Sequence, residues 1–141
     1  MIGKNNPLNI RTSAAFSWNG QTGSTKGFCD FESVELCRRA GAYLLMRSYR
    51  KANCKTLAQI ICRWAPHTEN DTASYIHVVC QLTGFKASDV MCFDSDFAAL
   101  LAAMEIVEDG VQRSKRESFF ATTKQSYIYV INHFNLKRYE S

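Results

Sequence analysis

A proline-centred corner at residues 63–75 constrains this chain more than any other stretch. An apolar run with helical spacing ends just before Pro66, and a second apolar run begins at Tyr75. Proline cannot continue a helix, because it lacks an N–H and its ring clashes with the preceding turn. Between the two runs lies a polar cluster in which Thr68 or Asn70 can cap a new helix. The stretch therefore predicts two helices joined by a short polar turn.

The spacing of apolar residues predicts further helices on both sides of this corner. The expected helices are 33–51, 57–65, 72–83 and 94–107. Thr56 is expected to cap the second, and Asp94 or Ser95 the fourth. Gly84 is expected to end the third helix and Gly110 the fourth. The arginines expected on the wet side of the first helix are Arg38, Arg39, Arg47 and Arg50. Ser114 and Glu117 are spaced as a capping box that opens a last helix. Residues 127–131 are β-prone, and their periodicity does not separate strand from helix.

A small hairpin is expected near the start of the chain. Residues 14–18 can form one strand, residues 19–24 carry a turn signal, and residues 27–31 can form the returning strand. The expected fold class is therefore mainly α with a small β-hairpin (α+β). The 141 residues fit a single domain, 1–141. Its expected parts are an N-terminal arm (1–13), the hairpin (14–31), a helical core (33–110) and a C-terminal segment (114–141).

Charge, hydropathy and cysteine spacing narrow the class of function. The net charge of +4 is mild and no basic block with interleaved aromatics occurs, so no nucleic-acid partner is expected. No apolar run approaches the ~18–20 residues of a spanning helix, and the first residues hold no signal-peptide core. We therefore expect no membrane partner and synthesis in the cytoplasm. The six cysteines form no Cys-x-x-Cys pair, so we expect reduced, mostly buried thiols and no zinc.

A carboxylate at the end of the 94–107 helix is the best candidate for chemistry. The sequence has no phosphate loop, dinucleotide fingerprint or serine-hydrolase elbow, and no metal or cofactor is implied. Glu108 stands where the chain turns, although an acid at a helix C-terminus opposes the macrodipole by ~0.3–1 kcal/mol. Half-burial favours the protonated carboxyl that a general acid of glycoside cleavage needs. The alternative interpretation is a solvated helix end.

Short segments between residues 6 and 110 occur in an order known from one protein family. They are Asn-Pro-Leu-Asn-Ile-Arg (6–11), Trp-Asn-Gly-Gln (18–21), Gly-Phe-Cys-Asp-Phe (27–31), Thr-Leu-Ala-Gln-Ile-Ile-Cys-Arg-Trp-Ala-Pro (56–66), Glu-Asn-Asp-Thr (69–72), Tyr-Ile (75–76) and Glu-Asp-Gly (108–110). This order resembles that of phage virion-associated proteins, described as structural or as peptidoglycan-degrading. Leu8 and Cys37 stand where that family has glycines, and Asp109 replaces an asparagine. The chain after about residue 112 is unlike the family.

A second set of segments is similar to lysozyme-like glucosaminidase domains of the flagellar type. In those domains a helix ending in Glu-Ser-Gly carries the catalytic glutamate and comes first, whereas here Glu-Asp-Gly at 108–110 comes last. Segments 9–11, 18–20, 28–31 and 71–78 resemble the motifs that follow that helix. A circular permutation of a lysozyme-like domain would explain the rotated order, because termini that lie close together permit permutation.

These resemblances imply a phage or prophage cell-wall glycosidase, virion-associated or released to the cell wall, that acts on peptidoglycan glycan strands and contacts other virion proteins. Glu108 would be the general acid, with Asp71 and Glu69 as candidate second carboxylates. The implied substrate-binding residues are Trp18, Asn70, Tyr75, Arg63 and Trp64. We therefore expect the corner at residues 63–75 and Glu108 to line the same cleft. The alternatives are a non-catalytic virion structural or peptidoglycan-binding module of the same fold, and a bacterial protein derived from a prophage.

Overall fold

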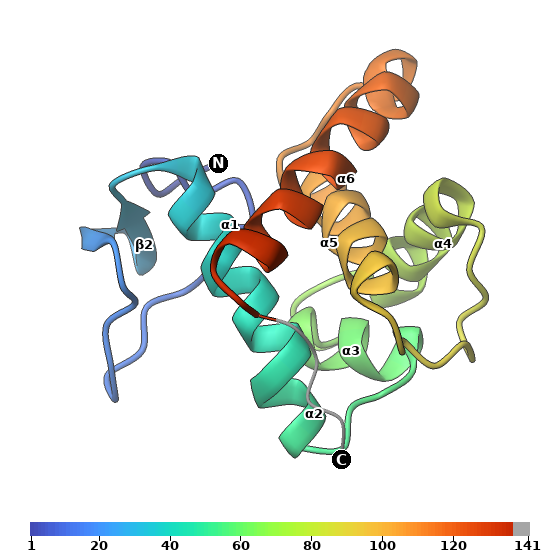
Figure 1. Cartoon of the computed structure of the whole chain (residues 1–141), viewed down its shortest axis with the longest axis horizontal. Helices are drawn as coiled ribbons and strands as arrows, with labels where there is room; N and C mark the ends of the chain where they lie inside the picture. The colour runs from blue at the N-terminus through green and yellow to red at the C-terminus, as the bar shows by residue number, and fades with distance from the viewer. Residues whose placement is uncertain (137–141) are drawn as a thin grey trace.

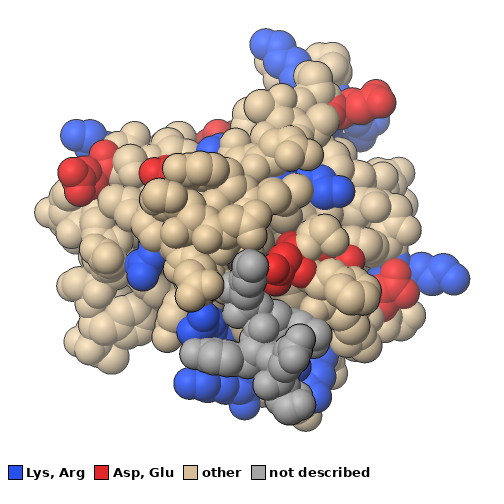
Figure 2. Space-filling model, viewed as in Figure 1, with Lys and Arg blue, Asp and Glu red and all other residues tan. Residues whose placement is uncertain are grey.

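The computed structural model describes residues 1–136 and is mainly helical, with one small antiparallel hairpin beside the helices (Figure 1). The expected fold class, mainly α with a small β-hairpin, is confirmed. Residues 137–141, the end of the expected C-terminal segment, lie outside the described residues. Within the described part of the chain, the helices pack around one hydrophobic core. Charged side chains of both signs are scattered over the face seen in Figure 2, and basic ones gather near α2.

The hairpin is present, but its first strand lies later than predicted. β1 (Gln21–Thr25) pairs with β2 (Phe28–Phe31), so residues 14–18 are not a strand and most of the expected turn is β1. The connecting residues Lys26 and Gly27 have φ of 51° and 84°. Two consecutive positive φ values define the tight turn whose twist matches the paired strands. This turn was not predictable from local composition, because Lys26 does not belong to the usual turn residues.

The predicted helix over 33–51 is confirmed as one continuous helical rod, but the middle of this rod is π-helical, which was not predicted. α1 (Val34–Tyr43) is capped by Ser33, continues as the π-helical segment η1 (Leu44–Ser48) and ends as α2 (Tyr49–Lys51). π-helical turns are rare and occur often at functional sites. The solvent-facing assignment of Arg38 is wrong, because its guanidinium pairs with the buried carboxylate of Glu105.

The two helices that flank the proline corner form as predicted, but the second cap differs. α3 (Leu57–Trp64) begins with a capping box between Thr56 and Gln59. α4 (Thr72–Thr83) begins at Asp71, whose carboxylate accepts the Ser74 N–H at 3.2 Å, so the expected caps Thr68 and Asn70 are wrong. A carboxylate at this position also lies next to the positive end of the helix dipole, which favours its negative charge. Gly84 ends α4 with φ of 79°, as predicted.

The helix that carries Glu108 runs through the middle of the fold. α5 (Asp94–Glu108) is buried along nearly its whole length, from Phe97 to Ile106. Its N-terminus is not capped by Asp94 or Ser95, since the Asp96 carboxylate instead accepts the backbone N–H groups of Cys92 and Phe93. The chain turns after Glu108, where Gly110 has φ of 63°. Gly110 is therefore the predicted stop signal of α5.

The last helix packs against α5 (Figure 1). A short 3-10 turn, η2 (Arg113–Lys115), leads into α6 (Arg116–His133). The predicted capping box of Ser114 and Glu117 does not form, because Ser114 already lies within the 3-10 turn. Residues 127–131 are helical, and Tyr127 and Ile131 enter the core. All six cysteines are free thiols. Among residues 1–136, no helix has the length and apolarity needed to cross a membrane.

Candidate functional site

A cleft of about 380 Å³ lies between the N-terminal arm, the π-helical rod, the proline corner and the end of α5. Aromatic side chains make up much of its lining: Phe16, Trp18, Phe28, Tyr49 and Trp64. Its polar lining consists of Asn9, Arg11, Glu69, Asn70 and Glu108. The corner at residues 63–75 therefore folds back toward the end of α5, and both segments wall one cleft. Aromatic walls with a few convergent polar groups are typical of a ligand-binding site.

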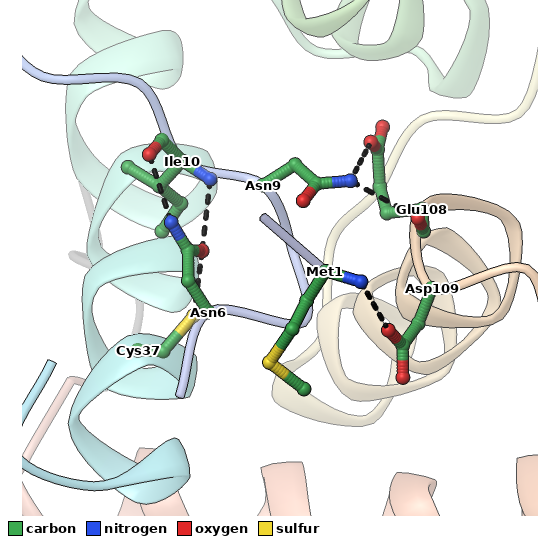
Figure 3. A network of polar contacts seen from close by, with 7 residues as sticks. All are labelled: Met1, Asn6, Asn9, Ile10, Cys37, Glu108 and Asp109. Atoms are coloured by element: carbon green, nitrogen blue, oxygen red, sulfur yellow. Dashed lines mark hydrogen bonds and ion pairs between the residues drawn. The ribbon is translucent and has the colours of Figure 1, made fainter. Parts of the chain in front are cut away.

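Glu108 is held in this cleft by three side chains from three different segments. Trp64 Nε1 donates to Glu108 Oε2 at 3.1 Å, and the Tyr75 hydroxyl donates to the same oxygen at 2.9 Å. Asn9 Nδ2 donates to Glu108 Oε1 at 3.2 Å and to the Glu108 backbone oxygen at 3.0 Å (Figure 3). An acid at a helix C-terminus is unfavourable by itself, and these donors offset that cost.

Tyr75 is a permanent donor to this carboxylate. Its side chain is buried, with a residue exposure of 6%. Burial, and next the negative charge of Glu108, raise the pKa of the Tyr75 phenol well above its ordinary value of 10. The phenol therefore keeps its proton at any working pH. An indole N–H has no acceptor role, so Trp64 is also fixed as a donor. Glu108 Oε2 consequently receives two hydrogen bonds under all ordinary conditions.

The N-terminal arm reaches Glu108 because Asn6 folds residues 6–10 into a tight loop. Asn6 is fully buried, its Nδ2 donates to the backbone oxygens of Ile10 and Cys29, and its Oδ1 accepts from the Ile10 N–H (Figure 3). Leu8 anchors the same loop in the core against Gly41, where an added Cβ would lie only 2.4 Å from Leu8 Cδ1. Leu8, which departs from the glycine of the resembled family, is thus accommodated by a glycine on the facing helix.

The structure brings most of the predicted site residues together. Those that line the cleft are Trp18, Trp64, Glu69, Asn70 and Glu108. Tyr75 lies behind Glu108 and contacts it through its hydroxyl. Asp71 is not among the lining residues, and its carboxylate accepts both the Ser74 N–H and the Ser74 hydroxyl. Arg63 also lies outside the lining, with its guanidinium 5.3 Å from the centre of the Tyr49 ring.

Several lining residues were missed by sequence reasoning. Asn9 and Arg11 stand in the 6–11 segment, which was recognised as a motif without any role. The Arg11 guanidinium lies 5.0 Å from the centre of the Phe28 ring, at one end of the cleft. Phe16 and Tyr49 carry no signal that separates a cleft aromatic from a core aromatic. Tyr49 reaches the cleft because it directly follows the π-helical segment, which the periodicity does not reveal.

Comparison with known proteins relates this chain to phage proteins. No family model matches the chain. It is 34% identical over 110 residues to Protein P5 of Pseudoalteromonas phage PM2, and this alignment covers 75% of the chain and 68% of that protein. The chain therefore belongs to a family of phage proteins, the one that contains Protein P5. The predicted resemblance to phage proteins is confirmed at this level, whereas the peptidoglycan-degrading and lysozyme-like parts stay predictions.

Proposed function

We propose that this chain is a phage-type peptidoglycan glycosidase with Glu108 as its general acid. The observation that supports it best is a carboxylate in an aromatic-lined cleft, held by neutral donors and not by a cation. Among residues 1–136, no lysine or arginine forms an ion pair with Glu108. General acids of glycoside cleavage are carboxyls, and this one lines a cleft where a substrate could reach it. The substrate would be a glycan strand of the cell wall, approached by the protein as part of the virion or after release.

The aromatic walls suit a sugar ligand. Trp18 packs edge-on against Phe16, with ring centroids 4.9 Å apart, and Phe16 is 50% exposed. Ring faces carry negative charge density that attracts the polarised C–H groups of a pyranose. Trp64 also lines the cleft and lies next to Tyr49, with 6.5 Å between the ring centroids. Asn70 and Arg11 add donors for hydroxyl, carbonyl or carboxylate oxygens of the glycan.

The hydrogen bonds of Glu108 indicate which oxygen would carry the proton. Among residues 1–136, Oε2 receives two donors, whereas Oε1 receives only the Asn9 amide. In the proposed reaction the Oε1–H bond breaks, the proton passes to the glycosidic oxygen, and the C–O bond to the departing sugar breaks. A water oxygen then bonds to the anomeric carbon, and the proton that this water loses passes to a carboxylate of the site. Glu69 lines the same cleft and is the better candidate for the second carboxylate, which would orient a water or stabilise the developing positive charge.

One observation favours a second candidate, a non-catalytic virion or peptidoglycan-binding module of the same fold. The donors to Glu108 come from the arm, α3 and α4, so the carboxylate links these three segments to α5. A group with this many protein partners stabilises the fold even without chemistry. In that case Glu108 would be needed for stability, and the cleft would bind glycan strands without cleaving them.

The test is incubation of the purified chain with peptidoglycan from several wall types, followed by measurement of released reducing ends and mass analysis of the fragments. Glu108→Gln, purified in parallel, controls for contaminating host enzymes. The proposal predicts soluble muropeptides from at least one wall type with the wild type and none with the variant. Binding to walls without any released fragment would support the non-catalytic module.

A further inference from the structure

Asn9 combines a left-handed backbone with an unpaired side-chain oxygen beside the cleft. Its φ of 53° lies in the left-handed region, which asparagine adopts more readily than other non-glycine residues. Its Nδ2 donates to Glu108 twice, at the carboxylate Oε1 and at the backbone oxygen. Its own Oδ1 is buried and has no hydrogen-bond partner among the described residues. A buried acceptor without a partner is unfavourable, so its place beside the carboxylate calls for an explanation.

The surrounding loop fixes where the Asn9 amide points. Asn6 binds both backbone groups of Ile10, and Leu8 is buried against Gly41, so the residues on either side of Asn9 are anchored in the core. The Asn9 amide is therefore held beside Glu108 by a loop that is anchored on both sides (Figure 3).

We propose that Asn9 is a positioning residue that fixes the orientation of the Glu108 carboxyl. This inference rests on the proposed function for its catalytic meaning, but the contact itself can be tested without catalysis. Asn9 donates to Oε1 while Trp64 and Tyr75 donate to Oε2, so each oxygen of the carboxyl has its own donors. Asn9 and Glu108 both line the cleft, so the orientation that Asn9 sets is the one that a bound substrate would meet.

Other ionisable groups also face this site from each neighbouring element. They are Tyr75 on α4, Tyr49 on α2, Glu69 in the corner and Arg11 on the arm. None of them changes in the variants below, so a difference between variants reports Asn9. The nearest of them, Tyr75, keeps its proton because burial raises its pKa.

The Trp64 indole is a built-in reporter of Glu108. Its N–H donates to Glu108 Oε2, so its proton resonance follows the charge of the carboxylate as the pH changes. Trp18 is the only other tryptophan in the chain, and Trp18→Phe identifies the remaining indole signal as Trp64. The pH midpoint of this signal can be measured by NMR on the full chain without any substrate.

Asn9→Asp and Asn5→Asp form a matched pair for this measurement. Asn5 lies in the same arm, has φ of 54°, and donates through Nδ2 to the backbone oxygens of Phe31 and Glu32. Both variants disturb the arm, but only Asn9→Asp puts a second carboxylate beside Glu108. We expect Asn9→Asp to move the Trp64 midpoint to higher pH by about one unit or more, since a like charge favours the protonated form. Asn5→Asp should leave the midpoint at the wild-type value.

Asn9→Gly separates positioning from folding, because glycine suits the left-handed backbone but has no amide. We expect kcat on peptidoglycan to fall by on the order of tenfold to a hundredfold, with KM nearly unchanged. An unmoved Trp64 midpoint in Asn9→Asp, or an equal shift in Asn5→Asp, would overturn the inference. A shifted midpoint in a chain whose wild type cleaves no wall would support the Asn9–Glu108 coupling and reject the glycosidase.

Discussion

Two carboxylates on α5, one helical turn apart, have opposite environments. Glu105 is 1% exposed, and the Arg38 guanidinium donates to both of its carboxylate oxygens, from Nε at 3.0 Å and from Nη2 at 2.9 Å. The Tyr127 hydroxyl adds a third bond at 2.9 Å. Glu108 lines an open cleft, and its donors among residues 1–136 are all neutral groups. Glu105 is therefore paired with a cation in the core, whereas Glu108 accepts from amide, indole and phenol donors at the surface.

The difference shows how surroundings assign roles to identical side chains. A buried carboxylate that is bound by a bidentate guanidinium is out of reach of a substrate, so it serves the fold. A carboxylate that lines a solvent-open cleft can touch a substrate, so it can serve chemistry. On this account Glu105 belongs to the core and Glu108 to the function, although the sequence marks both only as acids near a helix end.

Removing the cation of the buried pair should give the largest change in stability. Arg38→Met keeps the apolar stem but leaves the Glu105 charge in the core without its partner. We expect the free energy of unfolding to fall by ~3–5 kcal/mol, measured by urea denaturation at neutral pH. Arg38→Met with Glu105→Leu is the control, and it should recover much of this loss because no unpaired charge remains. Equal destabilisation in the single and the double variant would show that the unpaired charge of Glu105 is not the cause of the lost stability.

Removing one tyrosine hydroxyl at each carboxylate should give a smaller loss of stability. Tyr75→Phe and Tyr127→Phe each delete one hydroxyl that donates to a carboxylate and keep the ring. A hydrogen bond to a charged group contributes ~1.5–3 kcal/mol, so both variants should lose stability by similar amounts. Only Tyr75→Phe should alter the pH dependence of wall cleavage, since it alone touches Glu108. An equal change in the pH profile from Tyr127→Phe would mean that the two carboxylates are not independent.

The smallest expected effect on stability comes from replacing Asp71, the N-cap of α4. Hydrogen bonds from Ser74 lower the pKa of Asp71 below its ordinary value of 3.8. A lowered folded-state pKa means that the charged cap stabilises the fold above pH 3.8 and that this gain is lost as the pH falls through the lowered pKa. Asp71→Asn should therefore be slightly less stable than the wild type at neutral pH, and the difference should vanish in acid. Melting curves from pH 7 to pH 2 test this, and wall cleavage at neutral pH should be unchanged.

Much of the fold followed from local sequence signals. Pro66, the Thr56–Gln59 capping box, Gly84 and Gly110 set helix ends through backbone chemistry that acts within a few residues. The misplaced strand at 14–18 and the π-helical turn were not predictable, because tertiary packing and not local preference decides them. The cap of α4 was missed for a narrower reason, since Thr68, Asn70 and Asp71 are all good caps and only the geometry of the turn selects one.

The candidate site was predictable only in part. Glu108, Trp64 and Asn70 were found because a helix end and a polar corner are visible in the sequence. Asn9 was not found, because its contact joins residues 99 positions apart through a loop whose shape depends on Asn6. The role expected of Arg38 was wrong for the same reason, since its partner Glu105 lies on another helix. Long-range pairings of polar groups are the part of a structure that periodicity does not encode.

The most direct measurement compares Glu108→Gln with Glu105→Gln, each assayed for Tm and for fragment release from peptidoglycan below its melting temperature. The account predicts that the Glu108 variant releases nothing and melts closer to the wild type than the Glu105 variant does, because its remaining amide oxygen can still accept from Trp64 and Tyr75. It predicts that the Glu105 variant melts clearly lower, because Arg38 loses its anion, yet keeps wild-type activity while folded. Full activity in Glu108→Gln, or equal loss of activity in both variants, would contradict the division of roles between the two carboxylates.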